Sequence, residues 1–326
     1  MLEKLFSIKA SGSSIKSEVI GGFTTFLTMA YIIFVNPSIL SETGMDYGAV
    51  FVATCLAAAI GCLIMGFWAN YPVALAPGMG LNAFFTYTVV FSMGYTWQTA
   101  LGAVFFSGCI FFLLSAFRVR EWIIKSIPPT LRLAIAAGIG AFLALIGLQN
   151  ANIIVANDAT MVALGELGEP SVLLAAAGFF LIIGLVARGV QGAALISILA
   201  VTFIAWLTGL VDYNGIVSAP PSLAPTFLQM DLAAAFDLGM LSVIFAFLFV
   251  DLFDTSGTLL AVAQKAGLAK ADGHMPRLNK ALMADSTATV AGSMLGTSTT
   301  TSYIESAAGV ASGGKTGLAA VVVGVL

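Results

Sequence analysis

The chain has 326 residues, of which 59% are hydrophobic and only 9% are charged. Such a composition cannot present a solvated surface around a core, so a water-soluble globule is excluded and a lipid bilayer is the expected solvent. With 13 lysines and arginines and a net charge of -3, the chain has no basic surface, which excludes nucleic acid as a partner.

Apolar segments that are long enough, or nearly long enough, to cross a bilayer follow one another along the chain. The first predicted spans are 19–40, 48–68, 73–91, 97–117 and 131–148. The later ones are 171–187, 192–211, 236–262, 281–295, 299–312 and 316–326, of which the last three are weak individually. The sequence therefore predicts a polytopic membrane protein.

The distribution of charge indicates how these spans are oriented, because cytoplasmic loops are rich in lysine and arginine. If the N-terminus is inside, every basic residue from Lys4 to Lys315 falls on the cytoplasmic side. The opposite side collects acidic residues such as Glu42, Asp46 and Asp237. A miscounted span would disturb this sorting. We therefore predict a multi-pass protein of the cell inner (plasma) membrane with a cytoplasmic N-terminus.

The order of the spans predicts an inverted repeat. Seven spans precede a proline-containing outer connection, so the second half of the chain crosses the membrane in the opposite sense to the first. We predict a first repeat at 1–210, a linker at 211–235 and an incomplete second repeat at 236–326. Because the last residues are an apolar run, we expect a fragment that is truncated at about the eleventh span.

Carboxylates inside predicted spans are the first candidates for function. They are Asp251, Asp254, Asp285 and Glu305. A charge at the bilayer centre costs at least about 2.5 kcal/mol, and apart from Arg132 at the very edge of one span, no basic residue lies within a predicted span to pair with these acids. The alternative is a protonated carboxyl that only ties helices together. Asp251 and Asp254 are three residues apart and share a helix face with Thr255.

Two predicted spans are interrupted near their middle. Residues 297–302 are all threonine or serine, a composition that favours extended backbone, and a helix is expected to begin near Tyr303. Glu305 would then lie in its first turn. The third span is kept extended by prolines before Gly80 and Asn82, and Asn82 is the polar counterpart of Glu305. Interrupted helices at matching places in inverted halves indicate a binding site at mid-membrane.

Residues 309–316 match the phosphate-binding pattern G-x-x-x-x-G-K-[ST]. Such a loop joins a strand to a helix in a soluble α/β domain, whereas here it joins two predicted spans. We interpret the match as chance and Lys315 as an anchor at the cytoplasmic interface. The motifs H-E-x-x-H and G-x-S-x-G are not found, so we expect no enzyme, no metal site and no cofactor.

Four segments of the chain resemble the nucleobase cation symporter-2 family (xanthine/uracil permease superfamily), and within it the AzgA-like permeases for hypoxanthine, adenine and guanine. They are GGFTTFLTMAY at 21–31, APGMGLNAF at 76–84, FVDLFDT at 249–255 and TTTSYIES at 299–306. The resemblance covers the whole chain. It implies a UraA-like fold, all-α and polytopic, with two inverted repeats of seven spans, short strands in the third and tenth spans, and a possible homodimer.

The resemblance also implies roles for particular residues. Asp251 and Glu305 would be the base-binding acids, Asn82 and Gly80 would be site residues of the third span, and Asp285 would be a carboxylate linked to proton coupling or to the integrity of the site. A purine base offers N–H donors and acceptors on a flat aromatic body, which suits carboxylates, an amide and an apolar face.

Aromatic side chains beside these polar groups are candidates for that apolar face, namely Phe84, Tyr303 and Phe253. Because the site has no fixed cation, burial favours a bound proton on its acids. The predicted coupling ion is therefore a proton, and the predicted coupling residues are Asp251, Glu305, Asp285 and Asp254.

These observations together predict a secondary transporter that imports purine bases, hypoxanthine or guanine and also adenine, by proton symport. The alternatives are a transporter of another nucleobase, xanthine or uracil, and an anion carrier on the same fold. An anion carrier should have positive groups near the ends of the interrupted helices, and none is found there. A channel should show a continuous polar lining, whereas the polar groups here are clustered.

Overall fold

The computed structural model describes residues 2–117, 119, 129–157, 160–190, 192–211, 215, 219–268 and 275–326. Contacts within the chain define two compact units, Met1–Leu133 with Pro220–Leu326 and, separately, Ala134–Ala219. These units reflect packing, whereas the predicted repeats follow chain direction, so the repeat boundaries stay predictions. Of the basic residues used above, Arg118, Arg120, Lys125 and Lys270 lie outside the described residues.

The first unit consists of helices and one pair of short strands. Its elements are α1 (Leu2–Phe6), α2 (Ile15–Met29), α3 (Ile32–Ser41), α4 (Tyr47–Ile64), the π-helical η1 (Met65–Ala69), β1 (Leu75–Pro77), α5 (Met79–Ala83), the π-helical η2 (Phe84–Ser92), α6 (Trp97–Ala116), α11 (Leu232–Ala235), α12 (Leu238–Lys265), α13 (Leu278–Leu295), β4 (Thr300–Ser302), α14 (Ser306–Ala311) and α15 (Gly317–Val325). Each span predicted in this part of the chain contains one or two helical segments, which in the third and tenth spans follow a short strand.

Strands β1 and β4 pair antiparallel and bring the third and tenth spans together. Leu75 lies opposite Ser302, and Pro77 lies opposite Thr300. Both strands are buried along their length. The prediction of short strands in these two spans is confirmed, and the prolines and threonines that suggested it are the residues that form the strands.

Caps and turns fix where the helices begin and end. The carboxylate of Asp46 accepts the backbone N–H of Ala49 at 2.7 Å, which starts α4. Helix α13 ends at Gly296, which has a φ of 99°. Glycine adopts this conformation without the strain that a side chain would cause. The chain can therefore turn directly from α13 into the hydroxyl-rich run that forms β4.

The first predicted span differs from expectation, because α2 and α3 are separate helices joined by a turn at Ala30 and Tyr31. The N–H groups of Ile33 and Phe34 bond to carbonyls three residues earlier, at 3.2 and 3.1 Å, which tightens the backbone there. Because neither glycine nor proline occupies the turn, the sequence did not reveal it. The turn matters because it places Tyr31 at the candidate site described below.

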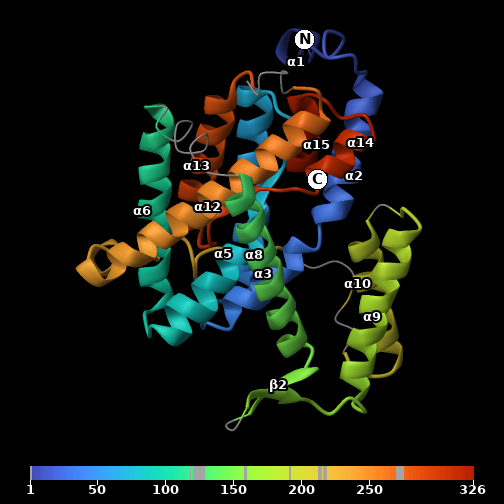
Figure 1. Ribbon diagram of the computed structural model, residues 1–326, viewed down its shortest axis with the longest axis vertical. Helices are drawn as coiled ribbons and strands as arrows, with labels where there is room; N and C mark the ends of the chain where they lie inside the picture. The colour runs from blue at the N-terminus through green and yellow to red at the C-terminus, as the bar shows by residue number, and fades with distance from the viewer. Residues whose placement is uncertain are drawn as a thin grey trace. The chain divides into compact units, whose positions relative to one another are not determined.

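Helices α14 and α15 pack against α2 even though they lie at the opposite end of the sequence (Figure 1). The approach is close because glycines face one another. A Cβ atom on Gly309 would overlap the hydroxyl oxygen of Thr25 and the carbonyl oxygen of Gly21. Small residues permit this kind of backbone contact between membrane helices.

We expect Gly309→Ala to destabilise the protein, since the added methyl group must push α14 away from α2. Overpacking of this kind costs about 1–3 kcal/mol, which corresponds to a fall in melting temperature of at least about 2 °C. The measurement is thermal unfolding of the purified protein in detergent. Gly184→Ala in α9 is the control, because a Cβ atom there meets nothing within 4 Å. An unchanged melting temperature for Gly309→Ala would contradict the close packing.

The second unit contains most of α8 (Pro129–Asn150), α9 (Pro170–Ala187) and α10 (Ala193–Leu207), with strands β2 (Ile154–Asn157) and β3 (Met161–Leu164). The two strands form an antiparallel hairpin in which Ile154 lies opposite Leu164. The expected all-α fold with short strands in the third and tenth spans therefore has a second strand pair in addition. This hairpin lies in the connection between two predicted spans.

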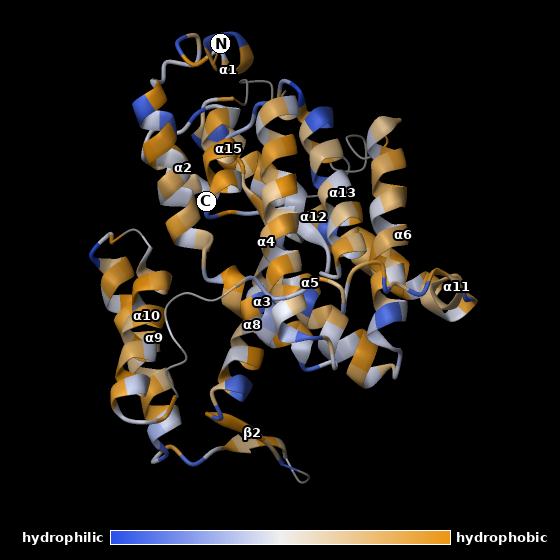
Figure 2. Ribbon diagram, turned by 180° about the vertical axis from the view of Figure 1, so that it is seen from behind, coloured by the Kyte–Doolittle hydropathy of each residue, from blue (hydrophilic) through white to orange (hydrophobic). Residues whose placement is uncertain are grey.

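The described helices have the lengths and composition of a membrane protein. Five segments are long and apolar enough to cross a bilayer: Ile15–Ser41, Tyr47–Ala69, Trp97–Ala116, Pro170–Ala187 and Leu238–Lys265. Figure 2 shows mainly hydrophobic residues along α4, α6, α9 and α10. Helix α13 is more polar, but it packs against α6 and α4, and Asp285 is fully buried within it. Burial thus keeps this polar face away from lipid.

Candidate functional site

The paired strands hold the two interrupted spans in register around the predicted acids. The N–H of Gly78 donates to the carbonyl of Thr299 at 2.9 Å, and the N–H of Tyr303 donates to the carbonyl of Ala74 at 2.9 Å. These bonds extend the pairing beyond both ends of the strands. Tyr303 ends the extended segment, and its carbonyl accepts the N–H of Ser306 at 3.2 Å in the turn that leads into the next helix.

Helix α14 therefore begins at Ser306 rather than near Tyr303, and Glu305 is the residue that precedes its first turn. The predicted position of Glu305 at a helix N-terminus is correct, whereas the predicted start of that helix was about one turn too early. The hydroxyl of Ser306 accepts the N–H of Ala74 at 3.0 Å. The start of α14 is thus fixed directly to the chain that leads into β1.

Glu305 is partly exposed and belongs to a group of polar side chains from several spans. The hydroxyl of Tyr31 donates to its Oε1 at 2.7 Å. Tyr303 lies close to Tyr31, Glu305 and Asp254, and Asp254 is hydrogen-bonded to Thr301. We call these five residues the Glu305 group.

A second group, which we call the aspartate pair, lies deeper and joins α12 to α13. Asp251 and Asp285 are both fully buried. The hydroxyl oxygen of Thr255 lies 3.0 Å from Oδ1 of Asp251 and 3.0 Å from Oδ1 of Asp285. Ser302 of β4 donates to Oδ1 of Asp285 at 3.3 Å. The predicted residues Asp251 and Asp285 are therefore bridged by one threonine.

The hydrogen-bond geometry of this bridge indicates where protons can lie between the two acids. A hydroxyl group has one proton and can donate one ordinary hydrogen bond. With an aspartate oxygen at 3.0 Å on either side, one contact is donated by Thr255. The other becomes a hydrogen bond when that carboxyl group carries a proton and donates to the threonine oxygen. The arrangement can therefore accommodate one proton on the two acids.

The third-span residues have different surroundings. Asn82 is fully buried, and its Oδ1 accepts a hydrogen bond from Ser298. Its amide nitrogen has no hydrogen-bond partner in the part of the chain that the structure describes. Gly80 is partly exposed in the same helix, α5. The amide nitrogen of Asn82 is therefore a donor that a bound ligand could satisfy.

The predicted aromatic face is only partly assembled. The hydroxyl of Tyr303 donates to the carbonyl of Pro77 at 2.5 Å, so it fastens the tenth span to the third. The ring of Phe84 packs edge-on against Phe247, with 5.1 Å between ring centres. Phe253 is partly exposed on α12. Tyr303 is thus beside the acids, whereas Phe84 packs against α12.

The segment 309–316, which matches the phosphate-loop pattern, contacts a buried glutamate of α2. The carboxylate of Glu18, which is fully buried, accepts the backbone N–H groups of Lys315 and Thr316 at 3.0 and 3.1 Å. A phosphate in such a loop would need backbone N–H groups of this kind. Here they bind a glutamate, and this contact ties the start of α15 to α2.

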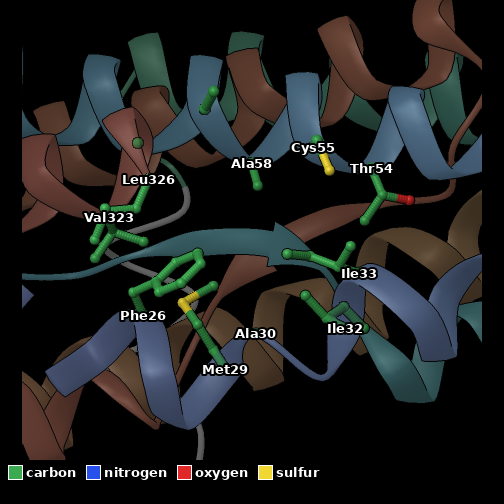
Figure 3. Close-up of a pocket in the computed structure, with 12 residues that line it drawn as sticks. Phe26, Met29, Ala30, Ile32, Ile33, Thr54, Cys55, Ala58, Val323 and Leu326 are labelled. Carbon is green, nitrogen blue, oxygen red and sulfur yellow. The ribbon is translucent and has the colours of Figure 1, made fainter. Parts of the chain in front are cut away.

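An apolar pocket in the first unit lies apart from the acids. Figure 3 shows side chains of α2 and α3 facing those of α4 across it, near the end of α15. The residues that line it include Phe26, Met29, Cys55, Val323 and Leu326, and no acidic residue is among them. A base bound here would not meet the predicted carboxylates, so this pocket is not the candidate site.

Comparison with known proteins can now be set beside this geometry. Residues 16–326 match the Xan_ur_permease profile, described as a permease family. The chain belongs to this family. The nucleobase cation symporter-2 membership that the four motifs indicated is thereby confirmed.

Individual relatives of this permease are similar along its whole length. It is 54% identical over 326 residues to the adenine permease AdeP of Escherichia coli (strain K12), covering 100% of this chain and 73% of AdeP. It is 48% identical over 337 residues to the guanine/hypoxanthine permease PbuG of Bacillus subtilis (strain 168), covering 100% of this chain and 76% of PbuG. Similarity therefore extends through every segment that forms the candidate site.

A solved structure supports the fold. The transmembrane domain of a cyanobacterium bicarbonate transporter, BicA, superimposes with a TM-score of 0.63 at 15% identity, covering 95% of this chain and 79% of that domain. At this level of identity the likeness concerns the fold alone. It confirms a helical, polytopic membrane fold for this permease.

Several residues of the site, among them Tyr31, Thr255 and Thr301, were not among the predicted ones. Tyr31 contacts Glu305, and Thr255 bridges the aspartate pair. In the sequence, Thr255 is indicated by its position on the same helix face as Asp251. Tyr31 is the last residue of the first of the four family motifs. The turn before α3 and the packing of α12 on α13, which bring these residues to the acids, could not be predicted from the sequence. The functional roles of all these residues remain predictions.

Proposed function

We propose that this permease imports purine nucleobases by proton symport, from the outer side of the plasma membrane to the cytoplasm, with its N-terminus inside. The observation that supports it most directly is the gathering of four carboxylates, Asp251, Asp254, Asp285 and Glu305, around the paired strands. Burying a charged carboxylate in a membrane costs free energy, and the cost is greater for neighbouring carboxylates unless they bind protons or a ligand.

The substrate class follows from the chemistry of the site and from the relatives. Glu305 can accept N–H donors, and the free amide donor of Asn82 can bond to a ring nitrogen or carbonyl oxygen of a base. AdeP is named an adenine permease, and PbuG is named a guanine/hypoxanthine permease. Both kinds of name indicate purine bases, so adenine, hypoxanthine and guanine are the proposed substrates.

The proposed proton site is the aspartate pair. Its threonine bridge can accommodate one shared proton, so release of that proton to the cytoplasm would change the hydrogen bonding between α12 and α13. One positive charge crossing 100 mV provides about 2.3 kcal/mol, which supports roughly a fifty-fold gradient of a neutral base.

The test is uptake of radiolabelled adenine into proteoliposomes that carry an imposed pH gradient, acid outside. We expect saturable uptake that a protonophore abolishes, and competition by unlabelled hypoxanthine and guanine. Uracil, xanthine and bicarbonate, which represent the alternative substrates, should compete poorly. Uptake that is independent of the pH gradient would overturn the proton symport, and strong competition by bicarbonate would favour an anion carrier.

A further inference from the structure

The contact between Tyr31 and Glu305 joins two spans at the places where both are interrupted. Tyr31 lies in the turn between α2 and α3, and Glu305 directly precedes α14. The hydroxyl of Tyr31 donates to Oε1 of Glu305 at 2.7 Å, a short bond of the kind formed with carboxylates. Both side chains are partly exposed, whereas Asp251 and Asp285 are fully buried.

This bond determines which part of Glu305 faces a ligand. A glutamate side chain has several rotatable bonds, and a carboxylate that is oriented before the ligand arrives binds it with a smaller entropic cost. The phenol occupies one acceptor position on Oε1. Oε2 and the second lone pair of Oε1 stay available to the N–H groups of a base.

The nearby Tyr303 cannot take over this role, because its own hydroxyl donates to the carbonyl of Pro77 at 2.5 Å. The two tyrosines are close together, but one fastens the tenth span to the third and the other contacts the acid. Of these two tyrosine hydroxyls, only that of Tyr31 is directed at Glu305.

We propose that Tyr31 is a positioning residue for the purine site, in which its hydroxyl holds the Glu305 carboxylate in the orientation that accepts an N–H group of the base. The inference rests on the proposed function, because it takes Glu305 as the acceptor of the base. Tyr31 does not itself need to touch the ligand.

The test is equilibrium binding of labelled adenine to the purified protein in lipid nanodiscs. We expect Tyr31→Phe, which removes only the hydroxyl, to weaken binding about tenfold, the usual effect of losing a hydrogen bond to a charged group. In a Glu305→Gln background, where the phenol can donate only to a neutral amide oxygen, the same change should weaken binding clearly less than tenfold. The control is Tyr87→Phe, which removes a bond of 3.0 Å from a partly exposed tyrosine to Glu42, outside the site, and should leave binding unchanged.

Infrared difference spectra provide a second measurement that does not depend on the ligand. Tyr31→Phe should shift the carboxylate stretching band, and the shift should vanish in the Glu305→Gln background. Equal weakening of adenine binding in both backgrounds would show a packing role and overturn the inference, as would unchanged binding or an unshifted band in Tyr31→Phe. If the protein without substitutions binds no purine base, the proposed function fails instead.

Discussion

Asp251→Asn and Glu305→Gln are each expected to reduce purine uptake by roughly a hundredfold, the equivalent of about 3 kcal/mol. Each substitution keeps the size of the side chain but replaces an acceptor oxygen with an amide donor. At Glu305 the amide would oppose the N–H groups of a base, and at Asp251 it would remove an acid from the threonine-bridged pair. The measurement is initial uptake of labelled hypoxanthine and adenine in cells that lack other purine transporters.

A matched control is available on the same helix as Asp251. Asp237 directly precedes α12, is exposed, and makes no capping hydrogen bond through its side chain. Asp237→Asn therefore changes an acid to an amide without touching the site, and it should leave uptake unchanged. If both Asp251→Asn and Glu305→Gln transported purines as well as the parent protein, the assignment of these acids to the substrate would be wrong.

Much of this site could be predicted from the sequence because its residues are costly in a membrane. Asp251 and Glu305 stand out in an apolar chain, and the hydroxyl run before Glu305 predicts the strand that the structure contains. These are local properties of composition and backbone preference. They need no knowledge of which spans are neighbours.

The contacts between spans could not be predicted in the same way. Tyr31 looks like an ordinary aromatic residue of the first span until the turn at α3 directs it to Glu305. Thr255 was recognised as polar, but its second partner, Asp285, lies on α13. Distances across a bundle depend on helix packing, which periodicity does not encode, so both residues emerged only from the structure.

Asp285→Asn is expected to separate transport from proton coupling. With its nitrogen at the Oδ2 position, 3.2 Å from Thr255, the new amide group can donate to the hydroxyl oxygen of Thr255, which then donates to Asp251. Its oxygen, at the Oδ1 position, still accepts from Ser302. The variant therefore imitates the state in which the acid carries the proton, and it keeps the contacts between α12 and α13. It cannot release that proton.

We expect accumulation of adenine driven by a pH gradient to fall more than about tenfold in Asp285→Asn, while exchange of labelled for unlabelled adenine, which needs no net proton movement, persists. Among the residues that the structure describes, Asp251, through Thr255, and Asp254 are acids that lie near Asp285. Asp285→Ala is the matched comparison, because it removes the contacts to Thr255 and Ser302 and should lose both accumulation and exchange. Accumulation that survives in Asp285→Asn would show that the proton is carried by another acid, for which Asp251 and Asp254 on α12 are the candidates.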